Sequence, residues 1–236
     1  MNHMPKYFRK QTLHLEIDFR PNPYSGLYIA LEGIDGSGKS TQAKLLAKYF
    51  ESKGRKVTQT YEPNLTLFGH EDILKIYNRE KKISGQAFQY LLTANRLINH
   101  AEIIEPALER GDVVISDRCF WSAIPYGVMD NKSEYKLDKA QRMLVTQSIL
   151  SLFHQSISPD LVFYLEVSAQ EGMKRLNSRK EGRKKDIYEE KEKLERVVRG
   201  YDFLLENFPE QITPVDGERA IDEISKDLIK KIEVRS

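Results

Sequence analysis

The chain has 236 residues, enough for one substantial domain, and its 37 basic residues nearly balance its 35 acidic ones. This small net charge gives no reason to expect a nucleic acid or a membrane as a partner. A single cysteine, Cys119, excludes an intramolecular disulfide and a multi-cysteine zinc site. No segment approaches the roughly 20 apolar residues of a membrane span or the pattern of a signal peptide, so we expect a soluble, cytoplasmic protein.

The first 25 residues read as an appendage to the rest of the chain. Apolar and polar residues alternate over residues 13–19, which predicts a short half-buried strand, and the prolines of the segment RPNP end it. We expect residues 1–25 to form an N-terminal extension, either a tail or an extra edge strand. Residues 26–236 are expected to form a single domain.

From residue 27 onward, short apolar runs alternate with segments of helical period. Strands are predicted at residues 27–33, 56–61, 112–116, 161–167 and 212–215. Helices are predicted at about 40–53, 87–108 and 137–153, followed by a charged helix that ends near residue 207 and a C-terminal helix. Pro106 predicts a kink or break near the end of the second of these helices. This alternation predicts an α/β fold, a three-layer sandwich with a central parallel sheet of about five strands and helices on both faces.

Residues 33–41 read GIDGSGKST and match the phosphate-binding pattern G-x-x-x-x-G-K-[ST] between an apolar strand and an amphipathic helix. Glycines let the backbone N–H groups point inward at a phosphate, and the helix N-terminus adds partial positive charge there. Lys39 is expected to reach the β- and γ-phosphates of ATP, and the Ser40 hydroxyl to ligate Mg²⁺. The predicted ATP-binding residues are Gly33, Gly36, Ser37, Gly38, Lys39, Ser40 and Thr41. The loop predicts transfer of the γ-phosphoryl group of ATP but leaves the acceptor open.

Three segments extend this pattern: ALEGIDGSGKSTQAKLL, TANRLINH and DRCFWSAIPY. Together they make nearly nine tenths of the chain resemble the thymidylate kinase family of P-loop nucleoside-monophosphate kinases. The resemblance implies that the chain converts dTMP to dTDP with ATP and Mg²⁺, and that it forms a homodimer.

The resemblance also implies roles for residues on the acceptor side. Asp35 would hold the 3′-hydroxyl of the acceptor sugar, and Arg96 would grip the acceptor phosphate with its planar fork. Arg118 would contact phosphate as well, and Tyr126 would pack against the deoxyribose. The implied substrate-binding residues are Asp35, Leu92, Arg96, Arg118, Ser122 and Tyr126.

Asp117 ends a predicted strand, and the resemblance implies that it supports the Mg²⁺ site with Ser40 or fixes the geometry of the neighbouring arginine. A basic stretch over residues 174–185 coincides with the family's lid over ATP, which we expect at about 178–188. Because the phosphate-binding loop contains no arginine, Arg179 or Arg183 of this lid is expected to neutralise charge on the transferred group. The implied catalytic residues are Lys39, Asp35, Arg118, Arg179 and Arg183.

Two positions depart from the family pattern. Tyr61 stands where relatives carry an arginine for the acceptor phosphate, and Leu92 stands where they carry a phenylalanine that stacks on thymine; Tyr90 or Phe68 are candidates to compensate. A kinase for another deoxynucleotide is therefore an alternative to dTMP. A deoxynucleoside kinase would need a general base for its hydroxyl acceptor, whereas Asp35 and the paired arginines favour a phosphate acceptor. A non-catalytic nucleotide-binding regulatory module is the more distant alternative.

Overall fold

The computed structural model describes residues 18–129, 139–178 and 190–234. Five strands of these residues form one all-parallel sheet in the order β2-β3-β1-β4-β5. The strands are β1 (Leu27–Glu32), β2 (Val57–Tyr61), β3 (Val113–Asp117), β4 (Leu161–Glu166) and β5 (Thr213–Asp216). The predicted α/β class and the parallel five-stranded sheet are confirmed.

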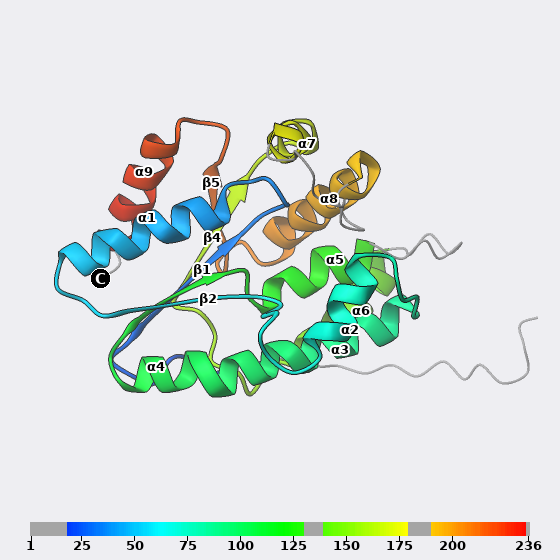
Figure 1. Cartoon of the computed structure of the whole chain (residues 1–236), viewed down its shortest axis with the longest axis horizontal. Helices are drawn as coiled ribbons and strands as arrows, with labels where there is room; N and C mark the ends of the chain where they lie inside the picture. The colour runs from blue at the N-terminus through cyan, green and yellow to red at the C-terminus, as the bar shows by residue number, and fades with distance from the viewer. Residues whose placement is uncertain (1–17, 130–138, 179–189, 235–236) are drawn as a thin grey trace, which may run out of the picture.

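Helices cover both faces of the sheet and complete a three-layer sandwich (Figure 1). They are α1 (Lys39–Ser52), α2 (His70–Tyr77), α3 (Gly85–Asn99), α4 (Glu105–Glu109), α5 (Ala123–Met129), α6 (Lys139–Leu150), α7 (Ala169–Ser178), α8 (Lys191–Asn207) and α9 (Ile221–Glu233). Helices α1 and α9 pack on one face, and the others lie toward the opposite face or the edge of the sheet. The short helices α2 and α5 were not predicted, because neither segment is long enough to show a helical period.

The sequence of strand β1 explains why helices cover both faces of the sheet. Ile29 and Leu31 join the core beneath α1 and α9, whereas Tyr28 and Ala30 face the helices of the opposite layer. Successive side chains of a strand point to opposite faces, so a strand that is apolar on both faces, as β1 is over residues 27–31, needs a cover on both sides. The sequence LYIALE is therefore the pattern of a central strand in a sandwich.

The long predicted helix is one continuous helical run with a change of pitch. Helix α3 passes into a π-helical turn, η1 (His100–Ile104), before α4 begins. Pro106 lacks the N–H group that would have bonded the carbonyl oxygen four residues earlier in a regular α-helix. The predicted disturbance near Pro106 thus takes the form of this π turn.

The described part of the N-terminal extension lies against the domain. Arg20 forms one isolated parallel bridge with Ile157, and the Phe19 ring packs against the core. Most of the predicted strand, residues 13–17, lies outside the described residues. None of the described helices is both long and apolar enough to cross a membrane.

Candidate active site

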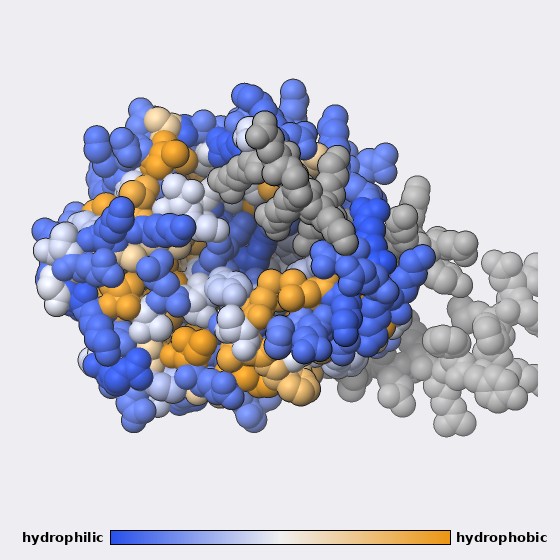
Figure 2. Space-filling model, in the orientation of Figure 1, coloured by the Kyte–Doolittle hydropathy of each residue, from blue (hydrophilic) through white to orange (hydrophobic). Residues whose placement is uncertain are grey.

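The site forms where the carboxyl ends of β1 and β3 meet, because these two strands are neighbours in the sheet. Leu31 pairs with Asp117, which places the start of the phosphate-binding loop beside the segment 117–118. A cavity of about 510 Å³ opens at this edge, and the hollow in Figure 2 shows hydrophilic residues there. Its lining includes Asp35, Gly36, Gly38, Lys39, Ser40, Thr41, Tyr61, Glu62, Leu65, Tyr77, Leu92, Arg96, Asp117, Arg118, Ser122 and Tyr126. Ligands of open parallel sheets bind at this edge.

The phosphate-binding loop depends on two glycines. Gly36 and Gly38 have φ angles of 84° and 100°, which residues with a Cβ atom adopt only at a cost. At Gly36, an added Cβ would also lie 2.5 Å from the carbonyl oxygen of Gly172 on α7. Gly38 is the N-cap of α1, so the loop runs directly into a helix N-terminus, the arrangement that binds phosphate.

Lys39 is folded over this loop. Its Nζ donates hydrogen bonds to the carbonyl oxygens of Gly33 at 3.1 Å and Ile34 at 2.9 Å, and the residue is buried. Burial, followed by the nearby Arg118 guanidinium, lowers the pKa of Lys39. Since both of its partners are neutral carbonyl groups, the ammonium has no carboxylate bonded to it that a phosphate would have to displace.

Ser40 and Asp117 approach each other across the loop. The Ser40 hydroxyl donates to Asp117 Oδ2 at 2.5 Å. A hydroxyl and a carboxylate are oxygen ligands of the kind that Mg²⁺ prefers, with waters and substrate phosphates completing the shell. The described residues contain no group of three or more His, Cys, Asp or Glu side chains that could hold a metal ion.

Arg118 gathers the predicted acceptor residues around itself. It has a φ angle of 77°, in the left-handed region, which surrounding structure must hold in place. Its Nη2 donates to Asp35 Oδ1 and to the Tyr126 hydroxyl, each at 2.7 Å, and its Nη1 donates to the Ser122 hydroxyl at 3.2 Å. Burial opposes the charge of Arg118, but Tyr126, Asp35 and Tyr201 raise the pKa of the guanidinium well above its ordinary value. The structure therefore brings together four of the residues predicted for substrate binding, which are Asp35, Arg118, Ser122 and Tyr126.

A buried carboxylate behind this cluster was missed by sequence reasoning. Glu32 is fully buried and accepts hydrogen bonds from the Cys119 N–H at 2.9 Å, the Ser122 hydroxyl at 2.5 Å and the Tyr201 hydroxyl at 2.7 Å. The Tyr201 hydroxyl lies 3.3 Å from Arg118 Nη1 as well. A charged residue ending an otherwise apolar strand was the available signal for Glu32. Tyr201, from the distant helix α8, had none.

Arg96 projects from α3 into the opposite wall of the cavity. Its side chain is only 4% exposed, so the position is not a solvated helix face. Its Nε lies 3.3 Å from Glu62 Oε2, yet neither Nε nor Nη1 has a well-aligned hydrogen-bond partner among the described residues. Burial raises the pKa of Glu62 to about 7, although the charge of Arg96 opposes that shift. A buried guanidinium with unsatisfied N–H groups fits an anionic ligand.

Two asparagines of α3 fix the segment that faces Arg96. The Asn95 side chain accepts from the Asn64 N–H at 2.7 Å and donates to the carbonyl oxygens of Asn64 and Phe68, each at 2.9 Å. Asn99 accepts from the Thr60 hydroxyl at 2.7 Å. These bonds tie the end of β2 and the following loop to α3, so Glu62 is held against Arg96.

Known proteins are similar to this chain in sequence and in structure. A family model described as thymidylate kinase matches residues 31–228. The chain belongs to the thymidylate kinase family. It is 38% identical over 215 residues to a probable thymidylate kinase of Thermococcus gammatolerans, covering 88% of this chain and 96% of that protein. It is 30% identical over 209 residues to the thymidylate kinase of an Exiguobacterium species, covering 87% and 93%. Its structure is similar to that of Candida albicans thymidylate kinase, with a TM-score of 0.74 at 25% identity over 89% of this chain and 92% of that one.

Leu92 and Tyr77 both line the cavity. Leu92 is buried, and the Tyr77 ring packs edge-on against Phe88 with centroids 5.6 Å apart. Phe68 and Tyr90 are 67% and 57% exposed and do not line the cavity, so the suggestion that either compensates for Leu92 is wrong. Tyr77 is an aromatic lining residue that was missed, because α2 was not predicted.

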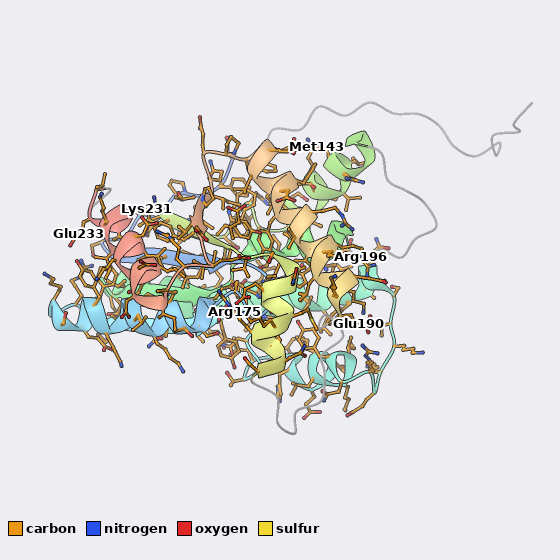
Figure 3. The ribbon with its side chains drawn as sticks, turned by 90° about the horizontal axis from the view of Figure 1, so that it is seen from above. Met143, Arg175, Glu190, Arg196, Lys231 and Glu233 are labelled. Atoms are coloured by element: carbon orange, nitrogen blue, oxygen red, sulfur yellow. The ribbon has the colours of Figure 1, made fainter. Side chains whose placement is uncertain are left out.

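The lid arginines Arg179 and Arg183 lie outside the described residues. The helices that flank this segment of the thymidylate kinase fold, α7 and α8, pack against each other, and Figure 3 labels Arg175 on α7 and Glu190 before α8. Arg175 donates to Glu171 at 2.9 Å and to the carbonyl oxygen of Gly217 at 3.0 Å. Part of the basic stretch is thus held on α7, against the loop that follows β5.

Proposed function

We propose that this chain transfers the γ-phosphoryl group of ATP to dTMP, giving ADP and dTDP. The observation that carries the proposal is the convergence of the phosphate-binding loop with Arg96 and the Arg118 cluster on one cavity. The donor and acceptor halves are thereby within reach of each other. Such a reaction is catalysed mainly by positioning two anions and neutralising their charge.

On the donor side, the loop N–H groups and Lys39 would hold the β- and γ-phosphates of ATP. Lys39 would exchange its two carbonyl partners for phosphate oxygens, a stronger charge-assisted contact. Ser40 and Asp117 would hold Mg²⁺, which when bound supplies positive charge to the phosphate oxygens. Arg179 or Arg183 would cover the donor and exclude water that could hydrolyse ATP.

On the acceptor side, the unsatisfied N–H groups of Arg96 would bind the phosphate of dTMP. Arg118 would bind the same phosphate from across the cavity, and Asp35 would accept a hydrogen bond from the 3′-hydroxyl. Because Asp35 and Arg118 are bonded to each other at 2.7 Å, acceptor binding would share or replace that contact. Tyr126 and Ser122 would flank the sugar, and Leu92 with Tyr77 would contact the base.

A phosphate acceptor fits this cavity better than a hydroxyl acceptor. The phosphate of dTMP is already an anion and needs no base, whereas a deoxynucleoside hydroxyl must lose a proton. Asp35, a carboxylate that lines the cavity, accepts a hydrogen bond from Arg118 and is positioned as a hydrogen-bond acceptor rather than as a free base. Two buried arginines also match the charge of a phosphate group.

We also propose that the enzyme is a homodimer in the cytoplasm. Tyr90 and Leu97 are 57% and 38% exposed and lie seven residues apart on α3, so they share a face of that helix. Such an apolar face is typical of a protein interface. The free, buried thiol of Cys119 fits a reducing compartment. Sedimentation velocity would report a species of twice the chain mass, and a monomer at all concentrations would refute the dimer.

The proposal is tested by measuring ADP release from ATP with dTMP, dUMP, dCMP, dGMP and thymidine supplied separately. We expect dTMP to give the highest kcat/KM and thymidine to give none. A preference for another monophosphate would move the assignment to another deoxynucleotide. Turnover with thymidine would indicate a deoxynucleoside kinase, and ATP binding without stimulation by any acceptor would indicate a regulatory module.

A further inference from the structure

Residues 18–24, which we call the strap, precede the part of the chain that the family model matches, which begins at residue 31. The Phe19 ring stacks on Phe120 with centroids 5.4 Å apart and an interplanar angle of 17°, and it contacts Trp121 at 5.5 Å. Phe120 and Trp121 belong to the buried core, and Phe120 stacks on Phe153 on its other side. Phe19 therefore completes an aromatic cluster within the domain.

Two members of this aromatic cluster come soon after Arg118 in the chain. Phe120 and Trp121 form the 3₁₀ turn η2 (Phe120–Ser122), which begins two residues after Arg118. The left-handed backbone of Arg118 is held on one side by the bond from its N–H to the Leu31 carbonyl oxygen at 2.8 Å. On the other side it continues into this turn, whose rings pack on Phe19. A strained backbone conformation persists only where the neighbouring structure fixes it. The packing of η2 therefore helps to set the direction of the Arg118 side chain.

Arg20 and Tyr24 of the strap bind near the end of the helical run that carries Arg96. The Arg20 guanidinium lies 3.0 Å from Glu105 Oε1, and the Tyr24 hydroxyl donates to the same carboxylate at 3.2 Å. Glu105 follows the π turn that ends α3. The carbonyl oxygen of Arg20 also accepts from the Ser158 N–H at 2.8 Å.

We infer that the strap is a positioning element for the acceptor site, with Phe19 as its anchoring residue. Phe19 fixes the turn that follows Arg118, while Arg20 fixes the helical run that carries Arg96. Arg96 and Arg118 come from different elements, and the distance between them must match the size of one phosphate group. The strap contacts the supporting structure of both arginines and so sets their relative position. The inference rests on the acceptor-binding roles proposed for Arg96 and Arg118.

The inference is tested with Phe19→Ala in the full chain, with Phe19→Leu as the conservative variant. The neighbouring substitution Asp18→Ala, at an exposed position, is the matched control. Binding of dTMP and of ATP is measured separately by calorimetry, alongside the melting temperature. We expect Phe19→Ala to raise the Kd for dTMP about fivefold while the Kd for ATP changes less than about twofold. Phe19→Leu should recover most of the affinity, and Asp18→Ala should change neither constant.

Equal losses for the two nucleotides, or unchanged dTMP binding in Phe19→Ala, would overturn the inference, since either result reduces Phe19 to a general stabilising contact. Should Phe19→Ala fail to fold, Arg20→Gln provides the same test at the other fastening point, with the same expected selective loss of dTMP affinity. Failure of the proposed function is distinguishable, because unmodified protein would then show no dTMP binding at all.

Discussion

Replacing Arg96 by methionine gives the sharpest test of how the cavity recognises its acceptor. Methionine approximates the length of the arginine stem and removes the guanidinium without leaving a large void. In the structure, the Nε and Nη1 groups of Arg96 are buried without a well-aligned hydrogen bond, while Glu62 lies 3.3 Å away. The folded protein therefore leaves part of the hydrogen-bonding capacity of this guanidinium unsatisfied, and these N–H groups can bind phosphate oxygens.

The magnitude follows from the bonds that a phosphate would make. A hydrogen bond to a charged group contributes about 1.5–3 kcal/mol, so losing a pair of them should cost about 3 kcal/mol of dTMP affinity, or roughly a hundredfold in Kd. The stability cost should be smaller. Without Arg96, the pKa of Glu62 loses the largest influence that lowers it, so more of this carboxyl is protonated at pH 7 and less buried charge is left unpaired.

The assay is calorimetric titration of Arg96→Met with dTMP and, separately, with ATP, together with a thermal melt. Arg55→Met, at an exposed arginine outside this cavity, is the matched control. The double variant Arg96→Met/Glu62→Gln should recover any lost stability but none of the lost dTMP affinity. The reasoning is refuted if Arg96→Met binds dTMP as tightly as the unmodified chain, or if it loses ATP affinity to the same extent.

Three further predictions concern the donor side and the buried carboxyl. Lys39→Ala should lower turnover more than about a hundredfold with an unchanged circular dichroism spectrum, because its charge contacts the phosphates; retained turnover would contradict the role. Ser40→Ala should raise the Mg²⁺ concentration for half-maximal ADP release about tenfold or more, and an unchanged Mg²⁺ dependence would remove Ser40 from the metal site. The folded-state pKa of Glu62 lies above its ordinary value of 4.5, so the stability that its protonated form contributes is fully present below about pH 4.5 and is lost as the pH rises through about 7. Urea unfolding between pH 5 and 8 should therefore show a fall of up to about 3 kcal/mol that is absent in Glu62→Gln, and parallel curves would disprove it.

The phosphate-binding loop could be predicted from sequence because its chemistry is local. Gly36, Gly38 and Lys39 act through backbone conformation and a helix N-terminus that a few consecutive residues specify. The sheet was equally readable, since buried parallel strands are short apolar runs separated by helices. Both inferences needed only neighbouring residues.

Contacts between distant segments could not be predicted in this way. Glu62 faces Arg96 because asparagines of α3 hold the loop after β2, and Tyr201 reaches Glu32 only because α8 packs over the end of β1. No spacing in the chain encodes either pair. Tyr77 was lost for a different reason, because α2 has eight residues and begins after the left-handed Gly69, leaving too short a period to recognise.

Product identification tests the central claim most directly. The chain is incubated with Mg²⁺, dTMP and ATP labelled in the γ-phosphate, and the products are separated by anion exchange. Phosphoryl transfer to dTMP predicts label in the β-phosphate of dTDP, in amounts equal to the ADP formed, and no such label with Lys39→Ala. Release of the label as inorganic phosphate, with dTMP unchanged, would contradict the account.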